Sequence, residues 1–505
     1  LEAVSAETGN SVAQTITEAQ GKDQVLSALS KAATELREKL GESLSSIEKF
    51  NAPAANATTS SLEALRSYAQ GRDQYGLKDN YTEAIALYKR ALELDPNFAL
   101  AWNGLAVIYS NLGQNGPAFE AAEKAYSLRD RVSEREKLGI VAYYYTHSGQ
   151  IEKSIETYRQ TLEIYPRQVT PHVNLSVALN RMGRLEEALA ETRLAIEADP
   201  NNGTAYQNSA DLLVRLGQYK ESEELIGKAI GLKLDRVGYH TTLYQLAAIK
   251  GDAGMLQKQL DWVKGKPDEF RAYEWQAQTA AYEGKFKAYE ELIARSVELS
   301  KQRNAPEITA ALLMYDGVRE AMAGQPARAR KALDQAVTIS PNSFAFYSYS
   351  KLSPFGPLML ALSGDLTRAE ESANQVVKNQ PSNTLSNSIW VPLTRAAIAV
   401  QKNDAQQAIE LLRKVAPFER AAFFYPAWVR AQAHMQLKQG KEAAAEYEKI
   451  LANRGYEPSS ILYPLARLGL ARAQALSGAT AQSRQSYEEF FKLWKDADAD
   501  VPVLV

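Results

Sequence analysis

The chain has 505 residues, of which 45% are hydrophobic and 23% are charged, and its formal net charge is −2. This length is too great for one compact core and indicates either several domains or an array of repeats. The 58 Lys and Arg are balanced by 60 Asp and Glu, so the basic excess of proteins that bind a phosphate backbone is missing and no nucleic-acid partner is expected.

Further classes of chemistry are excluded by composition. The sequence has no cysteine, which excludes disulfides, thiolate nucleophiles and zinc–thiolate sites. No apolar run approaches the roughly 18 residues needed to cross a bilayer, so we expect no membrane insertion of this chain itself. It opens with LEAVSAETGN, without Met, a basic n-region or an apolar h-region, and we expect a fragment of a longer protein.

The first segment, residues 1–50, predicts one hairpin and one helix. Apolar and polar residues alternate over residues 1–19 on both sides of Gly9, which is typical of a β-hairpin. Residues 22–43 have the apolar spacing of an amphipathic helix that ends at Gly41. A hairpin and a helix cannot form a domain alone, so we expect the tail of a truncated upstream module.

A polar linker, residues 51–64, leads into a region with a regular period. There a Gly or Asp follows each short helical pattern, and successive turn residues are 33 to 40 residues apart. A period of this size is typical of stacked helical hairpins. The twelve turn residues are Asp79, Gly113, Gly149, Gly183, Gly217, Gly251, Gly284, Gly324, Gly364, Asp404, Gly440 and Gly478.

Residues at fixed offsets from these turns explain how the hairpins stack. In the second unit the large Trp102 lies early in the first helix (helix A), and the small Ala118 allows the second helix (helix B) to approach closely. ALELDPN (91–97) and AIEADPN (195–201) both close a helix with Asp-Pro. This pattern resembles the tetratricopeptide repeat, most regularly over 65–235. The resemblance implies an all-α, right-handed superhelical solenoid of about twelve helical hairpins.

Residues 236–505 are expected to form divergent, longer units of the same kind. His240 stands where a large apolar side chain is expected, and three successive steps lengthen to 40 residues. One insertion, SFAFYSYSKLSPFGP (343–357), is rich in aromatic residues. Its counterparts are SNSIWVP (386–392) and ERAAFFYPAW (419–428).

These aromatic loops have two interpretations. Their rings either staple adjacent units together and are buried, or line an exposed recognition surface on a rigid scaffold. We expect burial of Trp390 and Trp428 and partial exposure of Tyr347 and Tyr349. The complete set of loop aromatics is Phe344, Phe346, Tyr347, Tyr349, Trp390 and Trp428.

No catalytic residue, cofactor or metal site is predicted. The Gly-rich, HRD and DFG segments of kinases are absent, as are the P-loop, Rossmann and HExxH patterns. The four histidines, His147, His172, His240 and His434, lie in different units, so they do not have the spacing of a metal site.

The repeat resemblance also implies a ligand groove. In the family, helix A lines the concave side, and its solvent-facing positions bind extended peptides. Here these positions form a polar set suited to peptide backbone and a carboxylate, although they could instead only solvate the groove. The lysines of the family's chaperone-tail clamp are missing, so a chaperone C-terminus is not expected. The groove residues are Asn103, Ser110, Tyr143, His147, Asn174, Asn180, Arg181, Asn208, Asp211 and Arg215.

Three long stretches, at 25–51, 128–166 and 490–504, resemble a second, more specific group. This group is the C-terminal region of large bacterial receptor-type proteins, commonly Hanks-type serine/threonine kinases. In these, a kinase domain and a membrane helix precede a TolB-like module and a tetratricopeptide array. The resemblance implies that residues 1–50 are the tail of a TolB-like module. The same region also accompanies winged-helix regulators, so the output domain stays open.

Two functions follow from these observations. The first is a non-catalytic sensor or scaffold that binds a protein or peptide, as part of a membrane-anchored bacterial signalling protein. We expect it on the periplasmic side, with the cytoplasm as the other possibility, and its oligomeric state is open. The alternative is an all-α carbohydrate-binding protein or glycan-active enzyme that uses the aromatic loops. Carboxylates around a closed pocket would favour the enzyme, and an open superhelix with a polar groove would favour the scaffold.

Overall fold

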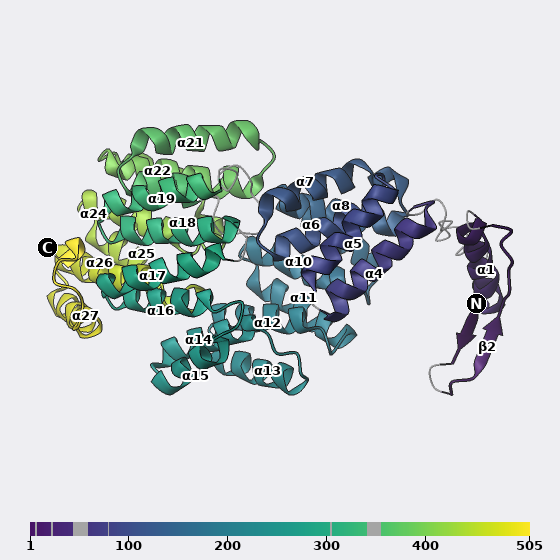
Figure 1. The fold of residues 1–505 in the computed structure, drawn as a ribbon. Helices are drawn as coiled ribbons and strands as arrows, with labels where there is room; N and C mark the ends of the chain where they lie inside the picture. Colours follow the sequence, from purple (N-terminus) through teal and green to yellow (C-terminus); the bar gives the residue numbers. More distant parts are fainter. Residues whose placement is uncertain are drawn as a thin grey trace. The chain divides into compact units, whose positions relative to one another are not determined.

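The structure is a computed structural model that describes residues 1–5, 8–21, 24–43, 59–78, 80–302, 306–340 and 355–504. Apart from one small hairpin, the described residues form helices that alternate along the chain in antiparallel pairs (Figure 1). Within these ranges, no helix combines the length and the apolar character needed to cross a membrane. The chain is therefore an all-α solenoid, as the sequence predicts.

The N-terminal segment contains the predicted hairpin and helix. Strand β1 (Glu2–Val4) pairs with the antiparallel strand β2 (Ser11–Gln14). Helix α1 (Val25–Lys39) follows, and Gly41 just beyond it has a left-handed φ of 86°. Only a residue without Cβ adopts this conformation at little cost, which explains why the helix ends there.

The described residues after this segment contain twelve helix pairs, in which the first member is helix A and the second is helix B. The A helices are α4 (Leu62–Lys78), α6 (Ala99–Asn111), α8 (Glu134–His147), α10 (Val169–Arg181), α12 (Gly203–Arg215), α14 (Val237–Lys250), α16 (Phe270–Tyr282), α18 (Pro306–Met322), α20 (Phe355–Leu362), α22 (Val391–Gln401), α24 (Tyr425–Gln436) and α26 (Leu462–Leu476). The B helices are α5 (Tyr81–Leu94), α7 (Asn115–Ser127), α9 (Ile151–Ile164), α11 (Leu185–Ala198), α13 (Tyr219–Gly231), α15 (Ala253–Val263), α17 (Phe286–Lys301), α19 (Pro326–Ile339), α21 (Leu366–Asn379), α23 (Ala405–Arg413), α25 (Gly440–Ala452) and α27 (Thr480–Leu493).

Short helical turns lie between some of the pairs or after the last one. They are η2 (Arg129–Arg131), the π-helical η4 (Ser386–Trp390), η5 (Ala416–Phe418), η6 (Arg454–Tyr456) and η7 (Pro502–Leu504). The segments η4 and η6 lie between repeats, in the longer connections of the second half of the array.

The turns between helices A and B follow the predicted ladder with one exception. Nine of the predicted glycines have φ between 71° and 81°. In the pairs α22–α23 and α24–α25, however, the left-handed residues are Asn403 and Lys438. Asp404 lies in its turn as predicted, between α22 and α23, but Gly440 is the first residue of α25 and not a turn residue. Asp404 also caps α23, and a Cβ on Gly440 would stand 2.7 Å from the carbonyl oxygen of Ala473. Close helix packing, and not turn conformation, explains Gly440. The remaining predicted turn residue, Asp79, lies outside the described residues.

Stacking of one pair on the next uses an aromatic ring over a small residue. A Cβ on Gly104 of α6 would lie 2.7 Å from the ring of Tyr88 in α5, and a Cβ on Gly469 of α26 would lie 2.3 Å from the ring of Tyr447 in α25. The small residue Ala188 on α11 is fully buried. The array is thus held by nearest-neighbour packing, which is how solenoids are stabilised.

His240, which departs from the repeat pattern, is part of this packing. The imidazole is buried and stacks on Trp262, with ring centroids 3.6 Å apart. Its Nδ1 lies 2.7 Å from Gln259 and its Nε2 lies 2.9 Å from Asp235. Histidine therefore fills the space of the expected apolar side chain, because both ring nitrogens have partners.

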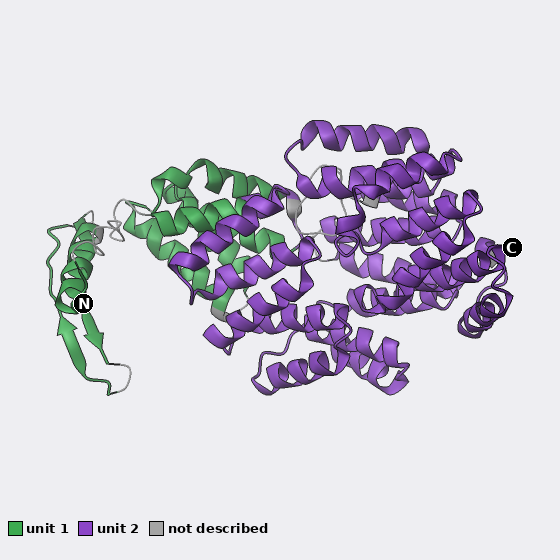
Figure 2. Ribbon diagram, turned by 180° about the vertical axis from the view of Figure 1, so that it is seen from behind, with its two compact units in different colours: residues 1–112, 117–144 green, residues 113–116, 145–505 purple. Residues whose placement is uncertain are grey.

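Two compact units make up the chain (Figure 2). Unit 1 contains residues 1–112 and 117–144, and unit 2 contains residues 113–116 and 145–505. The predicted change of repeat character at residues 235–236 lies inside unit 2 and stays a prediction.

Within unit 2, later repeats fold back onto the turns of much earlier ones. Thr384, in the connection before α22, donates from its amide and its hydroxyl to the carbonyl oxygen of Gly149, at 3.0 and 2.9 Å. Arg420, before α24, forms an ion pair with Glu186 at 2.8 Å. The longer connections therefore contact repeats far away in sequence, and not only adjacent repeats as the staple interpretation assumed.

The C-terminal segment makes the same kind of contact. Trp494 donates from its indole to the carbonyl oxygen of Tyr282 at 2.9 Å, and the amide of Asp498 donates to Gly284 at 3.0 Å. A Cβ on Gly284 would lie 2.8 Å from the Trp494 ring. These contacts close the curved array of unit 2 upon itself.

Candidate binding site

The A helices form the inner row of the curved array. In unit 2 neighbouring A helices contact each other directly, for example α10 with α12, α12 with α14, and α20 with α22. The B helices make their main contacts with the A helices on either side. Because the more closely spaced row of a curved stack lies on its concave side, side chains on the A helices are the ones that a ligand in the interior meets.

Three of the predicted groove residues do not face solvent. Ser110, Tyr143 and His147 are buried, with exposed fractions of 6%, 7% and 0%. In unit 1 the Tyr143 hydroxyl crosses to α6 and donates to the carbonyl oxygen of Ala106 at 3.2 Å, while Ser110 is small enough to be covered by the surrounding helices. In unit 2 His147 ends α8 beside the turn at Gly149, which the connection before α22 covers. Asn103 is half-buried in α6.

The other six predicted residues lie on α10 and α12 and are half-buried. Arg181 donates to the carbonyl oxygen of Thr146 at 3.1 Å, and Arg215 donates to Asn180 at 3.0 Å, each across 35 residues. The remaining three residues of this set are Asn174, Asn208 and Asp211. These contacts join successive A helices, and we call the row Thr146, Asn180, Arg181, Asp211, Arg215 and Thr242 the polar ladder.

The polar ladder continues toward α14. Thr242 donates to Asp211 at 2.6 Å, and Gln207 donates to both Asp211 and Thr242, at 3.0 and 3.3 Å. The Arg215 guanidinium lies 5.3 Å from the ring centre of Phe423 and 5.9 Å from that of Tyr456. In the sequence, the groove and the aromatic loops are separate features. In the structure they meet, because Phe423 of one aromatic loop lies next to Arg215 of the groove.

The two loop tryptophans are buried, as predicted. Trp390 is 6% exposed and Trp428 is 8% exposed. Trp428 meets Tyr447 edge to face, with ring centroids 5.8 Å apart. The other predicted loop aromatics, Phe344, Phe346, Tyr347 and Tyr349, lie outside the described residues.

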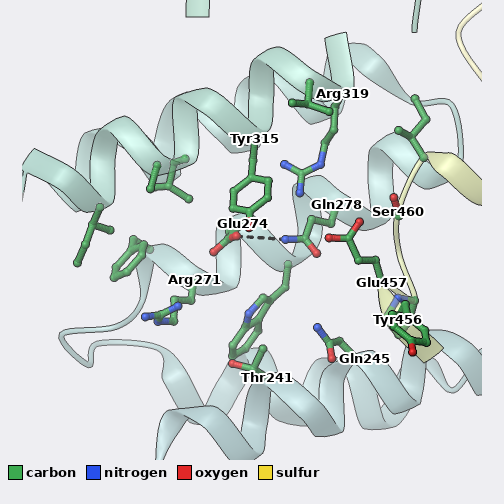
Figure 3. Close-up of a pocket in the computed structure, with 18 of the residues that line it drawn as sticks. Thr241, Gln245, Arg271, Glu274, Gln278, Tyr315, Arg319, Tyr456, Glu457 and Ser460 are labelled. Carbon is green, nitrogen blue, oxygen red and sulfur yellow. Dashed lines mark hydrogen bonds between the residues drawn. The ribbon is translucent and has the colours of Figure 1, made fainter. Parts of the chain in front are cut away.

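A cavity of about 440 Å³ lies in unit 2, next to the α14 end of the ladder (Figure 3). The A helices α14, α16 and α18 form its walls, and Tyr425 and residues 456–461 close it from the other side. Its polar lining consists of Thr241, Gln245, Arg271, Glu274, Gln278, Glu307, Tyr315, Arg319, Tyr425, Tyr456, Glu457 and Ser460. Phe270, Trp275 and Leu312 belong to its apolar lining.

Arg319 is the central cation of this cavity. Burial disfavours its charged form, but its interactions with Tyr289, Glu274 and Glu457 outweigh that effect and raise its pKa. Among the described residues no ion pair joins Arg319 to a carboxylate, although Glu457 interacts with it electrostatically and its side chain points toward the same space (Figure 3). Glu274 instead accepts a hydrogen bond from Gln278 at 3.1 Å.

Two other carboxyl groups near the cavity are affected by burial. Burial raises the pKa of Glu307, which lines the cavity. On another face of α18, burial and the nearby Asp316 raise the pKa of Glu320 to about 8. Asp316 accepts a hydrogen bond from the Tyr289 hydroxyl at 2.6 Å. Within the described residues, no three His, Cys, Asp or Glu side chains are grouped so that they could hold a metal.

The cavity residues were missed because the sequence gives no sign that they meet. Arg319 and Glu274 lie on A helices of the divergent half, where the repeat pattern is too weak to transfer groove positions. Glu457 reaches them only because the array folds back on itself. A basic residue on helix A shortly before a turn glycine, as in Arg215, Gly217 and again in Arg319, Gly324, was the available signal.

Comparison with known families identifies the repeats. Profiles described as "TPR repeat" and "Tetratricopeptide repeat" match residues 73–113 and residues 99–131, 170–202 and 203–236. These matches end where the regular pattern ends in the sequence. The chain therefore contains a tetratricopeptide array, although the matched residues are fewer than half of its length.

Curated relatives match only a short part of the chain. The RNA polymerase-associated protein CTR9 of Saccharomyces cerevisiae is 32% identical over 103 residues, which are 20% of this chain and 9% of CTR9. The small glutamine-rich tetratricopeptide repeat-containing protein 2 of Mycosarcoma maydis is 28% identical over 99 residues, which are 19% of this chain and 27% of that protein. The match thus spans less than a third of either relative.

Several solved structures are similar in fold to this chain. The Cut9 and Hcn1 hetero-tetramer of APC/C is 14% identical, covers 88% of this chain and 83% of the other, and has a TM-score of 0.40. The type IV pilus biogenesis factor PilW is 18% identical, covers 40% and 93%, and has a TM-score of 0.31. YrrB, described as having an unusual peptide-binding site, is 21% identical, covers 35% and 89%, and has a TM-score of 0.23.

Proposed function

We propose that this chain is a non-catalytic protein-interaction scaffold that binds an extended peptide segment along α10, α12 and α14. Tetratricopeptide repeats in general indicate a protein-interaction scaffold. The observation that supports this site best is the polar ladder, because it places guanidinium, carboxylate, amide and hydroxyl groups on the concave helices. Such groups can satisfy the peptide backbone and acidic side chains of a ligand.

The carbohydrate alternative needs exposed rings as a sugar platform. Of the loop aromatics that the structure describes, Trp390 and Trp428 are buried and do not form such a platform. The cavity does contain carboxylates, which would favour an enzyme, but they stand among two arginines and no pair has the isolated acid and base environments of a glycosidase. We therefore favour the scaffold.

The proposed site can be tested with a peptide selected on the purified chain from a displayed random library. Its affinity is then measured by fluorescence anisotropy for wild type, for Arg181→Ala on α10 and for the matched control Arg193→Ala on α11. Arg193 is exposed on helix B, where it pairs with Glu221. We expect roughly tenfold weaker binding for Arg181→Ala and unchanged binding for Arg193→Ala. Enriched peptides that bind both variants equally would place the site elsewhere, and a library without enriched peptides would contradict the function.

We further propose that the array is the sensor region of a membrane-anchored bacterial signalling protein and acts on the periplasmic side. The resemblance at 25–51, 128–166 and 490–504 supports this context. The exposed apolar side chains Val4 and Val12 support the origin of residues 1–50 from a larger module, because isolated hairpins do not normally expose such side chains. Sequencing the gene upstream of this segment tests the proposal. We expect the reading frame to encode a membrane helix and an output domain, and a reading frame without either would contradict the proposal.

A further inference from the structure

The cavity in unit 2 is built as a small-molecule site. Its volume of about 440 Å³ lies in the range of roughly 300–1,000 Å³ that such sites occupy. Its walls come from three consecutive A helices, and its closing segment, residues 456–461, comes from the far end of the array. A molecule held there would contact both regions at once.

Charges of both signs face this space without neutralising each other directly. Arg319 has no carboxylate within ion-pair distance among the described residues, whereas Glu274 and Glu457 are the carboxylates that interact with it electrostatically. Figure 3 shows the Arg319 guanidinium and the Glu457 carboxylate directed toward the same space from opposite sides. A cation and an anion held apart in a partly buried site are each stabilised by a ligand group of opposite charge.

The lining carries charges of both signs. Its charged residues are Arg271 and Arg319 and the glutamates Glu274, Glu307 and Glu457. Arg271 already forms an ion pair with Asp268 at 3.6 Å, which leaves Arg319 as the cation that faces the cavity carboxylates. A ligand of no net charge that carries both signs therefore fits better than a simple anion or cation.

The remaining wall is apolar. The buried side chains of Phe270 and Trp275 line the cavity from α16, and Leu312 lines it from α18. This surface is suited to an apolar or aromatic side chain of the ligand.

We propose that the cavity binds a small zwitterion of the free α-amino-acid class, with an apolar side chain. Arg319 holds its carboxylate, Glu457 and Glu274 hold its ammonium group, and Trp275 contacts its side chain. This site is separate from the peptide site on the polar ladder and does not depend on it. Because the ligand touches both α18 and residues 456–461, it stabilises the contact between these two parts of unit 2.

The test is isothermal titration calorimetry of the full chain with the twenty standard amino acids, followed by two derivatives of the tightest one. The N-acetyl derivative lacks the ammonium charge, and the carboxamide derivative lacks the carboxylate. We expect at least one apolar or aromatic amino acid to bind with a Kd of roughly 1 mM or lower and to raise the Tm. Each derivative should bind roughly tenfold to hundredfold more weakly.

Variants identify the residues that hold each end. Arg319→Gln should abolish binding, whereas Arg484→Gln, an exposed arginine on α27, should leave it unchanged. Glu457→Gln should bind the amino acid more weakly than wild type does. It should bind the N-acetyl derivative, which lacks the ammonium charge, with the same affinity as wild type. A variant that has simply unfolded cannot give this pattern. No binding of any amino acid to wild type, or equal binding of the parent and both derivatives, would overturn the proposal.

Discussion

Alanine in place of Gly183 probes the closure of unit 2 directly. Gly183 occupies the turn between α10 and α11 with a φ of 73°, and a Cβ there would lie 2.7 Å from Cβ of Arg420 and 2.9 Å from the amide nitrogen of Ala421. Gly217 occupies the equivalent turn between α12 and α13 with a φ of 74°, and a Cβ there would meet nothing within 4 Å. The two glycines are therefore a matched pair that differs only in the contact with the later repeat.

The magnitudes separate two effects. Placing alanine in the left-handed conformation destabilises the folded chain by about 1–2 kcal/mol. Alanine also lowers the conformational entropy of the unfolded chain, which stabilises the fold by about 0.4–1 kcal/mol. Gly217→Ala should therefore lower stability by roughly 1 kcal/mol. Gly183→Ala has the same two effects, and its Cβ also clashes with the backbone at Ala421. Such overpacking typically lowers stability by about 1–3 kcal/mol more. We expect Gly183→Ala to be the more destabilising by that amount.

Urea denaturation followed by far-ultraviolet circular dichroism measures both variants against wild type. Tryptophan fluorescence, recorded on the same samples, reports whether the repeats unfold together. Equal losses of stability for the two variants would show that the connection before α24 does not rest on the turn at Gly183. The fold-back of unit 2 would then be refuted, although the individual helix pairs would stand.

Three further predictions concern packing and pH. Trp428→Ala removes a buried ring that packs on Tyr447, and we expect a loss of roughly 3–5 kcal/mol in urea denaturation; a loss below about 1 kcal/mol would show that the ring is not a packing element. Ala188→Leu should overpack α10 against α11 by roughly 1–3 kcal/mol, and an unchanged Tm would mean that the repeat register is wrong. Because the pKa of Glu320 is raised to about 8 in the folded chain, its neutral form is favoured, and the stability that it contributes is present at low pH and is lost as pH rises from about 4.5 through 8. Glu320→Gln should therefore match wild type near pH 4 and exceed it by up to about 4 kcal/mol near pH 9, and parallel pH profiles of the two proteins would contradict the assignment.

The fold was predictable because it depends on local signals. Most hairpins have a glycine at the turn, a small residue such as Ala188 between the helices, and an apolar stripe, and these features recur every 33 to 40 residues in the sequence. The error at Gly440 arose because a glycine can serve close helix packing as well as a turn conformation.

The site was less predictable because it depends on distant contacts. The positions Arg181 and Arg215 follow from the repeat register, but the burial of Tyr143 and His147 depends on how neighbouring helices and a later connection cover them. The cavity around Arg319 requires residues 456–461 to return to α18, and no local pattern encodes that return.

Hydrogen–deuterium exchange with and without a selected peptide tests the scaffold assignment most directly. If the peptide lies on the concave face, amide exchange slows in α10, α12 and α14, the helices of the proposed site, while α11 and α13 on the other row exchange as before. Protection confined to α11 and α13, or no protection at saturating peptide, would contradict the claim that this chain binds its partner along the A helices.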